Sequence, residues 1–234
     1  MFVFSGCGFQ TENPENPLEE PVDLPESVEQ ISENQEAEEN TYEPVLISDF
    51  EPVCQFPELP TGCEVTSLTM VLNYYGFDVD KTEMADSWIV KDEVGYTDFR
   101  QAFVGNPRDN LSYGCYAPVI GDAAERFLAD NESEINVFVL EGCEFEQLFS
   151  YLNDGIPVIV WGTLDCKEGY ESVTWNVDGK ELSWITPEHC MVLIGYDEDN
   201  VSVADPYYGD VRTYDRELFG ERFEQLYGQA VVLE

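Results

Sequence analysis

Basic residues are scarce in this sequence. Its 234 residues include 10 Lys and Arg against 49 Asp and Glu, which gives a formal net charge of −39 at pH 7. No Lys or Arg occurs before Lys81. Because proteins bind phosphate backbones through Lys and Arg, we expect neither nucleic acid nor an anionic membrane surface as a partner. The charge would steer a cationic peptide substrate towards the protein, and it would serve solubility equally well.

Histidine and metal-binding motifs are also scarce. His189 is the only histidine, and no Cys-x-x-Cys pair occurs. Structural zinc sites need about four Cys or His ligands at short spacings, so we expect no metal and no other cofactor. The odd number of cysteines leaves at least one thiol outside any disulfide, and the pairing of the others stays open. The seven cysteines are Cys7, Cys54, Cys63, Cys115, Cys143, Cys166 and Cys190.

Long apolar runs are missing as well. No run reaches the roughly 18 to 20 residues of a membrane-spanning helix, and there is no Walker motif for binding phosphate. Near the start, Phe4-Ser-Gly-Cys7 and the acidic linker after it resemble the end of a bacterial lipoprotein signal. The resemblance implies a lipid anchor on Cys7 and a place in the bacterial cell envelope or outside the cell. The alternative is a disordered terminus on a cytoplasmic protein.

The composition divides the chain into three parts. Residues 11–52 contain 14 acidic residues and no basic one, and they lack a sustained apolar period. We therefore predict a possible signal remnant at 1–10, an acidic disordered tether at 11–44 and one catalytic domain at 45–234, acting as a monomer.

An apolar stripe follows Cys63 and predicts a helix that ends at Gly76. Thr61-Gly-Cys-Glu64 has the pattern of a capping box, in which Thr61 and Glu64 satisfy early backbone N–H groups and Cys63 lies in the first turn. The positive end of the helix dipole would favour the thiolate form of Cys63. The alternative interpretation is a small buried structural cysteine. The stripe consists of Val65, Leu68, Leu72 and Tyr75.

Downstream, helical patterns give way to β patterns, which indicates an α+β fold with segregated layers. Asp178-Gly179 between two alternating runs predicts a hairpin. We expect Trp161 and Trp184 to line a substrate cleft, with packing in the core as the alternative. The expected helices are 78–88, 118–129, 142–152 and 216–227, and the expected strands are 157–161, 190–196, 201–204, 211–214 and 229–233.

Four residues have the types and the order that nucleophilic catalysis by a thiol needs. Cys63 would attack a carbonyl carbon, His189 would act as general base and then acid, and Asp205 would orient the imidazole. Gln55, eight residues before Cys63, would donate a hydrogen bond to the oxyanion. Each residue also has an ordinary structural interpretation, and the joint order of the four favours the catalytic one.

The assignment of Asp205 makes a geometric demand. With a four-residue loop at 197–200 and regular pairing, Asp205 would oppose Val192, and His189 would point to the other face of the sheet. The triad therefore predicts a loop of three or five residues, or a β-bulge between the two positions.

The sequence resembles the cysteine peptidase family thirty-nine-like domains, which are stand-alone bacterial relatives of the bacteriocin-processing double-glycine peptidases. The resemblance covers residues 45–234 and is most specific around Cys63 and His189. The matching segments are Gln55–Gly76, Phe103–Pro107, Tyr113–Pro118, Gly155–Trp161, His189–Asp197 and Val203–Pro206.

This resemblance implies a papain-like fold, a cysteine peptidase that acts on peptide or amide bonds, and the same four roles for Gln55, Cys63, His189 and Asp205. One alternative is a cell-wall amidase or acyl transferase that uses the same Cys-His dyad. Another is a non-catalytic binding module of the cell envelope on the same fold.

Overall fold

The computed structural model describes residues 43–234. The predictions for Cys7, for the signal remnant and for nearly all of the acidic tether lie outside these residues. Within 43–234, no helix combines the length and the apolar character needed to cross a membrane.

A seven-stranded antiparallel sheet forms the centre of the described part. Six strands run in the order β10-β9-β8-β5-β11-β4, and β1 pairs with β8. Every residue of β5 is buried, as fits a β-branched run covered on both faces. The strands are β1 (Val45–Leu46), β4 (Val137–Leu140), β5 (Val158–Thr163), β8 (Glu188–Tyr196), β9 (Asn200–Asp205), β10 (Asp210–Asp215) and β11 (Ala230–Leu233).

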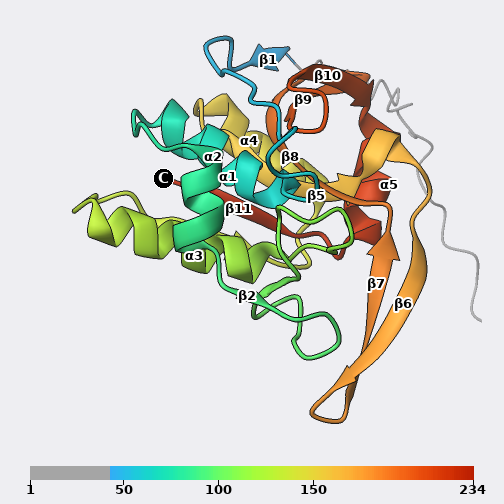
Figure 1. Ribbon diagram of the computed structural model, residues 1–234. Coiled ribbons are helices and arrows are strands. Elements are labelled where there is room, and N and C mark those ends of the chain that lie inside the picture. The colour runs from blue at the N-terminus through green and yellow to red at the C-terminus, as the bar shows by residue number, and fades with distance from the viewer. Residues whose placement is uncertain (1–42) are drawn as a thin grey trace, which may run out of the picture. The chain divides into compact units, whose positions relative to one another are not determined.

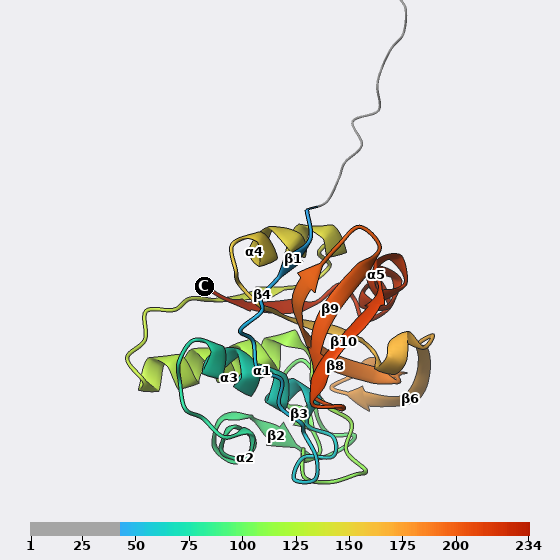
Figure 2. The ribbon, with the colours of Figure 1, turned by 90° about the horizontal axis from the view of Figure 1, so that it is seen from above.

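Helices cover both faces of this sheet. Helix α1 (Cys63–Tyr74) packs on β8 and β5, and α3 (Ala117–Asp130) packs on β4 and β11. Helix α5 (Arg216–Gln225) packs on β5, β9 and β10, and it lies across the sheet from α1 and α3 (Figure 2). The short helices η2 (Phe145–Leu148) and α4 (Phe149–Asn153) contact α5 and β8, respectively.

A hairpin extends from the body of the domain (Figure 1). Its strands are β6 (Tyr170–Val177) and β7 (Lys180–Thr186), which follow the short helix η3 (Leu164–Cys166). The turn residues Asp178 and Gly179 have φ of +50° and +84°, as a two-residue hairpin of the primed type requires.

The fold class and most elements agree with the sequence predictions. The predicted helix 78–88 begins later, because Asp80 accepts the N–H of Thr82 and caps α2 (Lys81–Glu83), which continues into the π-helical turn η1 (Met84–Trp88). The sequence interpretation missed β1, β4 and the short parallel pair of β2 (Lys91–Asp92) and β3 (Phe103–Val104).

Candidate active site

His189 and Asp205 are joined by a short hydrogen bond. Nε2 of His189 lies 2.7 Å from Oδ1 of Asp205, and the two residues are 3% and 0% exposed. A bulge in β8 makes this contact possible: Gly195 pairs with Ser202 and Leu193 with Val203, which leaves Ile194 without a partner on β9. The sequence predicted a loop of three or five residues or a β-bulge, and the bulge is what the structure shows; it brings Asp205 to the face to which His189 points.

Cys63 is the first residue of α1, as predicted. The predicted capping box is wrong, because the N-cap is Gly62 and no side chain caps the helix. Thr61 instead donates its hydroxyl to the carbonyl oxygen of Asp109 at 2.9 Å. Glu64 turns into the core, where it is 0% exposed.

Glu64 contacts the candidate nucleophile directly. Sγ of Cys63 donates to Oε2 of Glu64 at 3.3 Å, and the backbone N–H of Cys115 donates to Oε1 at 2.6 Å. Both carboxyl oxygens of this buried group therefore have a partner.

The protonation state of Cys63 differs from the sequence prediction. Burial raises the pKa of its thiol well above the ordinary value, and the nearby Glu64 and Glu188 carboxylates raise it further. The backbone N–H of Cys190 opposes them. In this arrangement desolvation and the two acidic neighbours oppose the helix dipole and favour the thiol form of Cys63, contrary to the prediction of a thiolate.

Three acidic groups meet at this point. Sγ of Cys63 and one carboxylate oxygen each of Glu64 and Glu188 lie within 4.8 Å of one another. Thiolate and carboxylate can hold a metal ion, but hydrogen bonds already occupy both oxygens of Glu64. We assign no metal here.

The sequence interpretation missed Glu64 and Glu188 as members of the site. The available signal was their position in the chain, because each is the immediate neighbour of a predicted catalytic residue, Cys63 or His189.

Helix α1 brings Cys63 to the start of β8. Ser67, one turn further along the helix, donates to the carbonyl oxygen of Cys190, and the N–H of Cys190 faces the Cys63 sulfur. Among the hydrogen bonds of residues 43–234, none joins Cys63 to His189. The thiol therefore lies beside the strand of His189 while its proton is directed to Glu64.

Gln55 is tied to the segment that follows β9. Its backbone N–H donates to the carbonyl oxygen of Pro206 at 2.7 Å, next to Asp205 in the chain. The side chain is 2% exposed, and Nε2 donates to the carbonyl oxygen of Pro60 at 2.9 Å. This bond uses one of the two amide N–H groups and leaves the other for a further acceptor.

Trp161 and Trp184 do not line an open cleft. Trp161 is 0% exposed and donates its indole N–H to the carbonyl oxygen of Cys115, while Trp184 is 4% exposed and stacks on Tyr116. Both rings pack in the core, so their assignment to substrate binding is wrong and the alternative holds.

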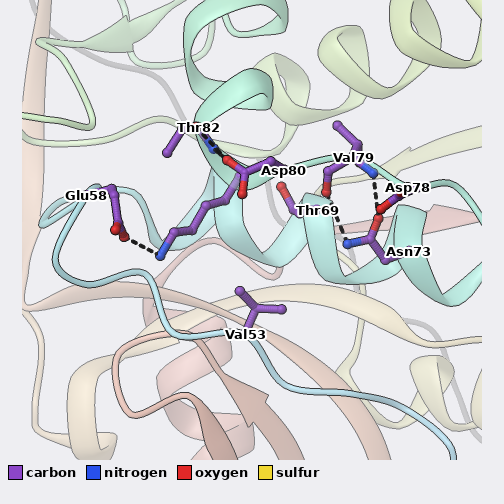
Figure 3. Close-up of a pocket in the computed structure, with 9 residues that line it drawn as sticks. Val53, Glu58, Thr69, Asn73, Asp78, Val79, Asp80 and Thr82 are labelled. Atoms are coloured by element: carbon purple, nitrogen blue, oxygen red, sulfur yellow. Dashed lines mark hydrogen bonds and ion pairs between the residues drawn. The ribbon is translucent and has the colours of Figure 1, made fainter.

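A separate cavity of about 610 Å³ lies between α1 and α2 (Figure 3). Lys81 bridges it, pairing with Glu58 at 2.8 Å and donating to the carbonyl oxygen of Cys54. Asn73 exchanges two hydrogen bonds with the backbone of Val79. The lining includes none of the four predicted catalytic residues, but Lys81 fixes the backbone on either side of Gln55.

The six cysteines within residues 43–234 are all free thiols. Cys63, Cys115, Cys166 and Cys190 are buried, and the other two, Cys54 and Cys143, are half-buried.

Comparisons with known proteins match nearly the whole described part. The model of a family described as Peptidase_C39 like matches residues 47–231. The uncharacterized protein YvpB of Bacillus subtilis is 32% identical over 183 residues, which cover 76% of this chain and 71% of YvpB. A crystal structure of a candidate C39-like peptidase from Bacillus anthracis superimposes with a TM-score of 0.75 at 31% identity, covering 82% of this chain and 98% of that one.

These matches agree with the fold predicted from the sequence, a papain-like arrangement of helices on an antiparallel sheet.

Proposed function

We propose that this chain, which belongs to the Peptidase_C39-like family, is a cysteine peptidase in which Cys63 is the nucleophile, His189 the general base and acid, Asp205 the orienting group and Gln55 an oxyanion donor. Peptide or amide bonds are the substrate class.

The buried hydrogen bond between His189 and Asp205 carries the proposal. A carboxylate on one ring nitrogen fixes the tautomer of an imidazole and leaves the other nitrogen to exchange protons. The start of β8, which carries His189, also faces Cys63 in the first turn of α1, through the backbone N–H of Cys190. A thiol, an imidazole and a buried carboxylate near one another are the groups that acyl transfer requires.

The reaction begins when the Cys63 side chain turns from Glu64 towards His189. The thiol proton passes to Nδ1 of His189, and the thiolate attacks the carbonyl carbon. The free N–H of Gln55 and the backbone N–H of Cys63 stabilise the oxyanion. His189 then protonates the leaving amine, and water, deprotonated by His189, releases the acid from the thioester.

A peptide library tests the function. The purified protein is incubated with synthetic peptides of varied sequence, and new termini are detected by mass spectrometry. We expect defined cleavage products, with rates that fall by on the order of 10⁴-fold in Cys63→Ala and in His189→Ala. Cys143→Ala is the matched control, because it removes a half-buried thiol outside the site.

Absence of cleavage by the unmodified protein, or equal cleavage by Cys63→Ala, contradicts the proposal. Products carrying an added amine, formed when glycine amide is present, indicate an acyl transferase instead. Products from cell-wall peptides alone indicate an amidase of the cell wall.

A further inference from the structure

Glu64 connects the candidate nucleophile to a second segment of the chain. Its carboxyl group accepts hydrogen bonds from the Cys63 thiol and from the Cys115 backbone, at 3.3 and 2.6 Å. With 0% exposure, the side chain cannot exchange these partners for water. The Glu64 carboxyl group therefore joins the start of α1 to the segment before α3.

The residue before Cys115 leaves room for this carboxyl group. Gly114 has φ of +147°, a region that other residues rarely adopt. A Cβ at this position would collide with Oε1 of Glu64 and come within 3.1 Å of the Trp184 ring. Only glycine lets the Glu64 carboxyl group reach the N–H of Cys115.

No positive side chain balances the acidic groups around the sulfur. None of the ion pairs within residues 43–234 includes Glu64 or Glu188. Ionising Cys63 beside either carboxylate therefore places two negative charges together in a buried space, which is costly.

The other titratable groups nearby do not offset this charge. Cys190 on β8 and Cys115 before α3 are buried thiols, and Tyr116 is a buried phenol. Burial raises the pKa of each above its ordinary value, so all three are neutral near pH 7. The imidazole of His189 is directed to Asp205.

We propose that Glu64 is a positioning residue that, together with Glu188, holds Cys63 as a protonated thiol until the sulfur turns to His189. The proposal rests on the proposed function, because it takes Cys63 as the nucleophile. When the contact breaks, the S–H proton moves to the imidazole nitrogen that is not bonded to Asp205, which yields a thiolate and an imidazolium. No oxidant or reductant takes part.

The direction of the pH effect follows from the same groups. Burial raises the pKa of Glu64 to about 7 and that of Glu188 well above its ordinary value. An ionised Glu64 repels a thiolate, so the carboxylate raises the pKa of Cys63. Replacing it by a neutral amide should lower the pKa of Cys63, and the thiolate should then form at lower pH.

The test is the rate of iodoacetamide alkylation at Cys63 between about pH 6 and 11, followed by peptide mass spectrometry on the full chain. In Glu64→Gln we expect the midpoint of the pH–rate curve to fall by at least about one unit. A lower pKa increases the fraction of thiolate at pH 7, but a less basic thiolate is also a weaker nucleophile. The rate at pH 7 should therefore rise by less than the thiolate fraction does, by about threefold or more. Glu125→Gln, on the exposed side of α3, is the control and should match the unmodified protein.

Glu188→Gln is a second test variant, and it leaves the hydrogen bond between the Cys115 N–H and Glu64 intact. We expect its curve to shift in the same direction, and circular dichroism verifies that each variant is folded. Curves of Glu64→Gln and Glu188→Gln that superimpose on that of the unmodified protein overturn the proposal. If Glu64→Gln does not fold, the curve of Glu188→Gln decides.

Labelling needs no substrate, so its outcome is separate from the peptidase test. A protein that cleaves no peptide but shows the shift in Glu64→Gln contradicts the proposed function and supports the role of Glu64. A protein that cleaves peptides through Cys63 but shows no shift in either variant supports the proposed function and contradicts the role of Glu64.

Discussion

At the scale of residues, Asp205 is fixed by donors on both carboxyl oxygens. Oδ1 accepts from the His189 ring at 2.7 Å and from the Tyr207 backbone N–H at 2.9 Å, and Oδ2 accepts from the Tyr214 hydroxyl at 3.5 Å. The carboxylate thus cannot turn without breaking several bonds. It holds the imidazole in one orientation.

Removing this carboxylate tests its orienting role. We expect Asp205→Ala to lower kcat/KM by on the order of 100-fold, because His189 then loses its fixed tautomer. Asp205→Asn retains an acceptor and should lose less. Asp210→Asn, an exposed residue on the neighbouring strand, is the control. Equal activity of Asp205→Ala and the unmodified protein, measured with a peptide from the library, rules out the orienting role.

The sequence identified the position of Cys63 but not its surroundings. Apolar spacing and Gly76 were enough to predict a helix that has Cys63 in its first turn and ends at Gly76, and α1 runs from Cys63 to Tyr74. Whether Glu64 would turn back to cap that helix or enter the core depends on a partner 51 residues away, the N–H of Cys115. A local pattern contains no information about that contact.

At the scale of elements, the bulge in β8 could be predicted from the sequence but not placed. With a four-residue loop, the spacing of His189 and Asp205 required an irregularity in the pairing, and the structure places it at Ile194. Strand β4 was missed because it is short and half-exposed, and only its pairing with β11 defines it.

Helix α5 offers a test of local structure away from the site. Asp215 caps it by accepting the N–H of Leu218 at 2.8 Å. We expect Asp215→Ala to lower the free energy of unfolding by about 1 kcal/mol in urea titration, through loss of this cap. Glu217→Ala, exposed in the same turn, should change it by less than half of that. Equal effects of the two substitutions would show that the cap contributes nothing.

At the scale of the whole molecule, the order of helices and strands in the sequence was enough to predict the layers. Helical periods before residue 153 and β-branched runs after 157 indicated helices packed on an antiparallel sheet. The placement of α5 on the second face could not be predicted, since its pattern shows which residues are apolar but not which face they meet.

The net charge of −39 predicts how the protein selects substrates. We expect kcat/KM for a cleaved library peptide extended by four Lys to fall on the order of 10-fold between about 20 and 300 mM NaCl, because salt screens the attraction. The same peptide extended by four Gln serves as the control and should change little. A parallel response of the two peptides would mean that the acidic surface does not steer substrates.

The position of β11 has a consequence for how the protein is made. This strand follows all the other strands of the sheet in the chain, yet it inserts between β5 and β4 rather than adding to an edge. Strands β5 and β4 do not pair with each other, because each pairs with β11. During translation their facing edges therefore stay open until residues 230–233 leave the ribosome. The sheet that supports His189 is therefore complete only after this part of the chain has been synthesised.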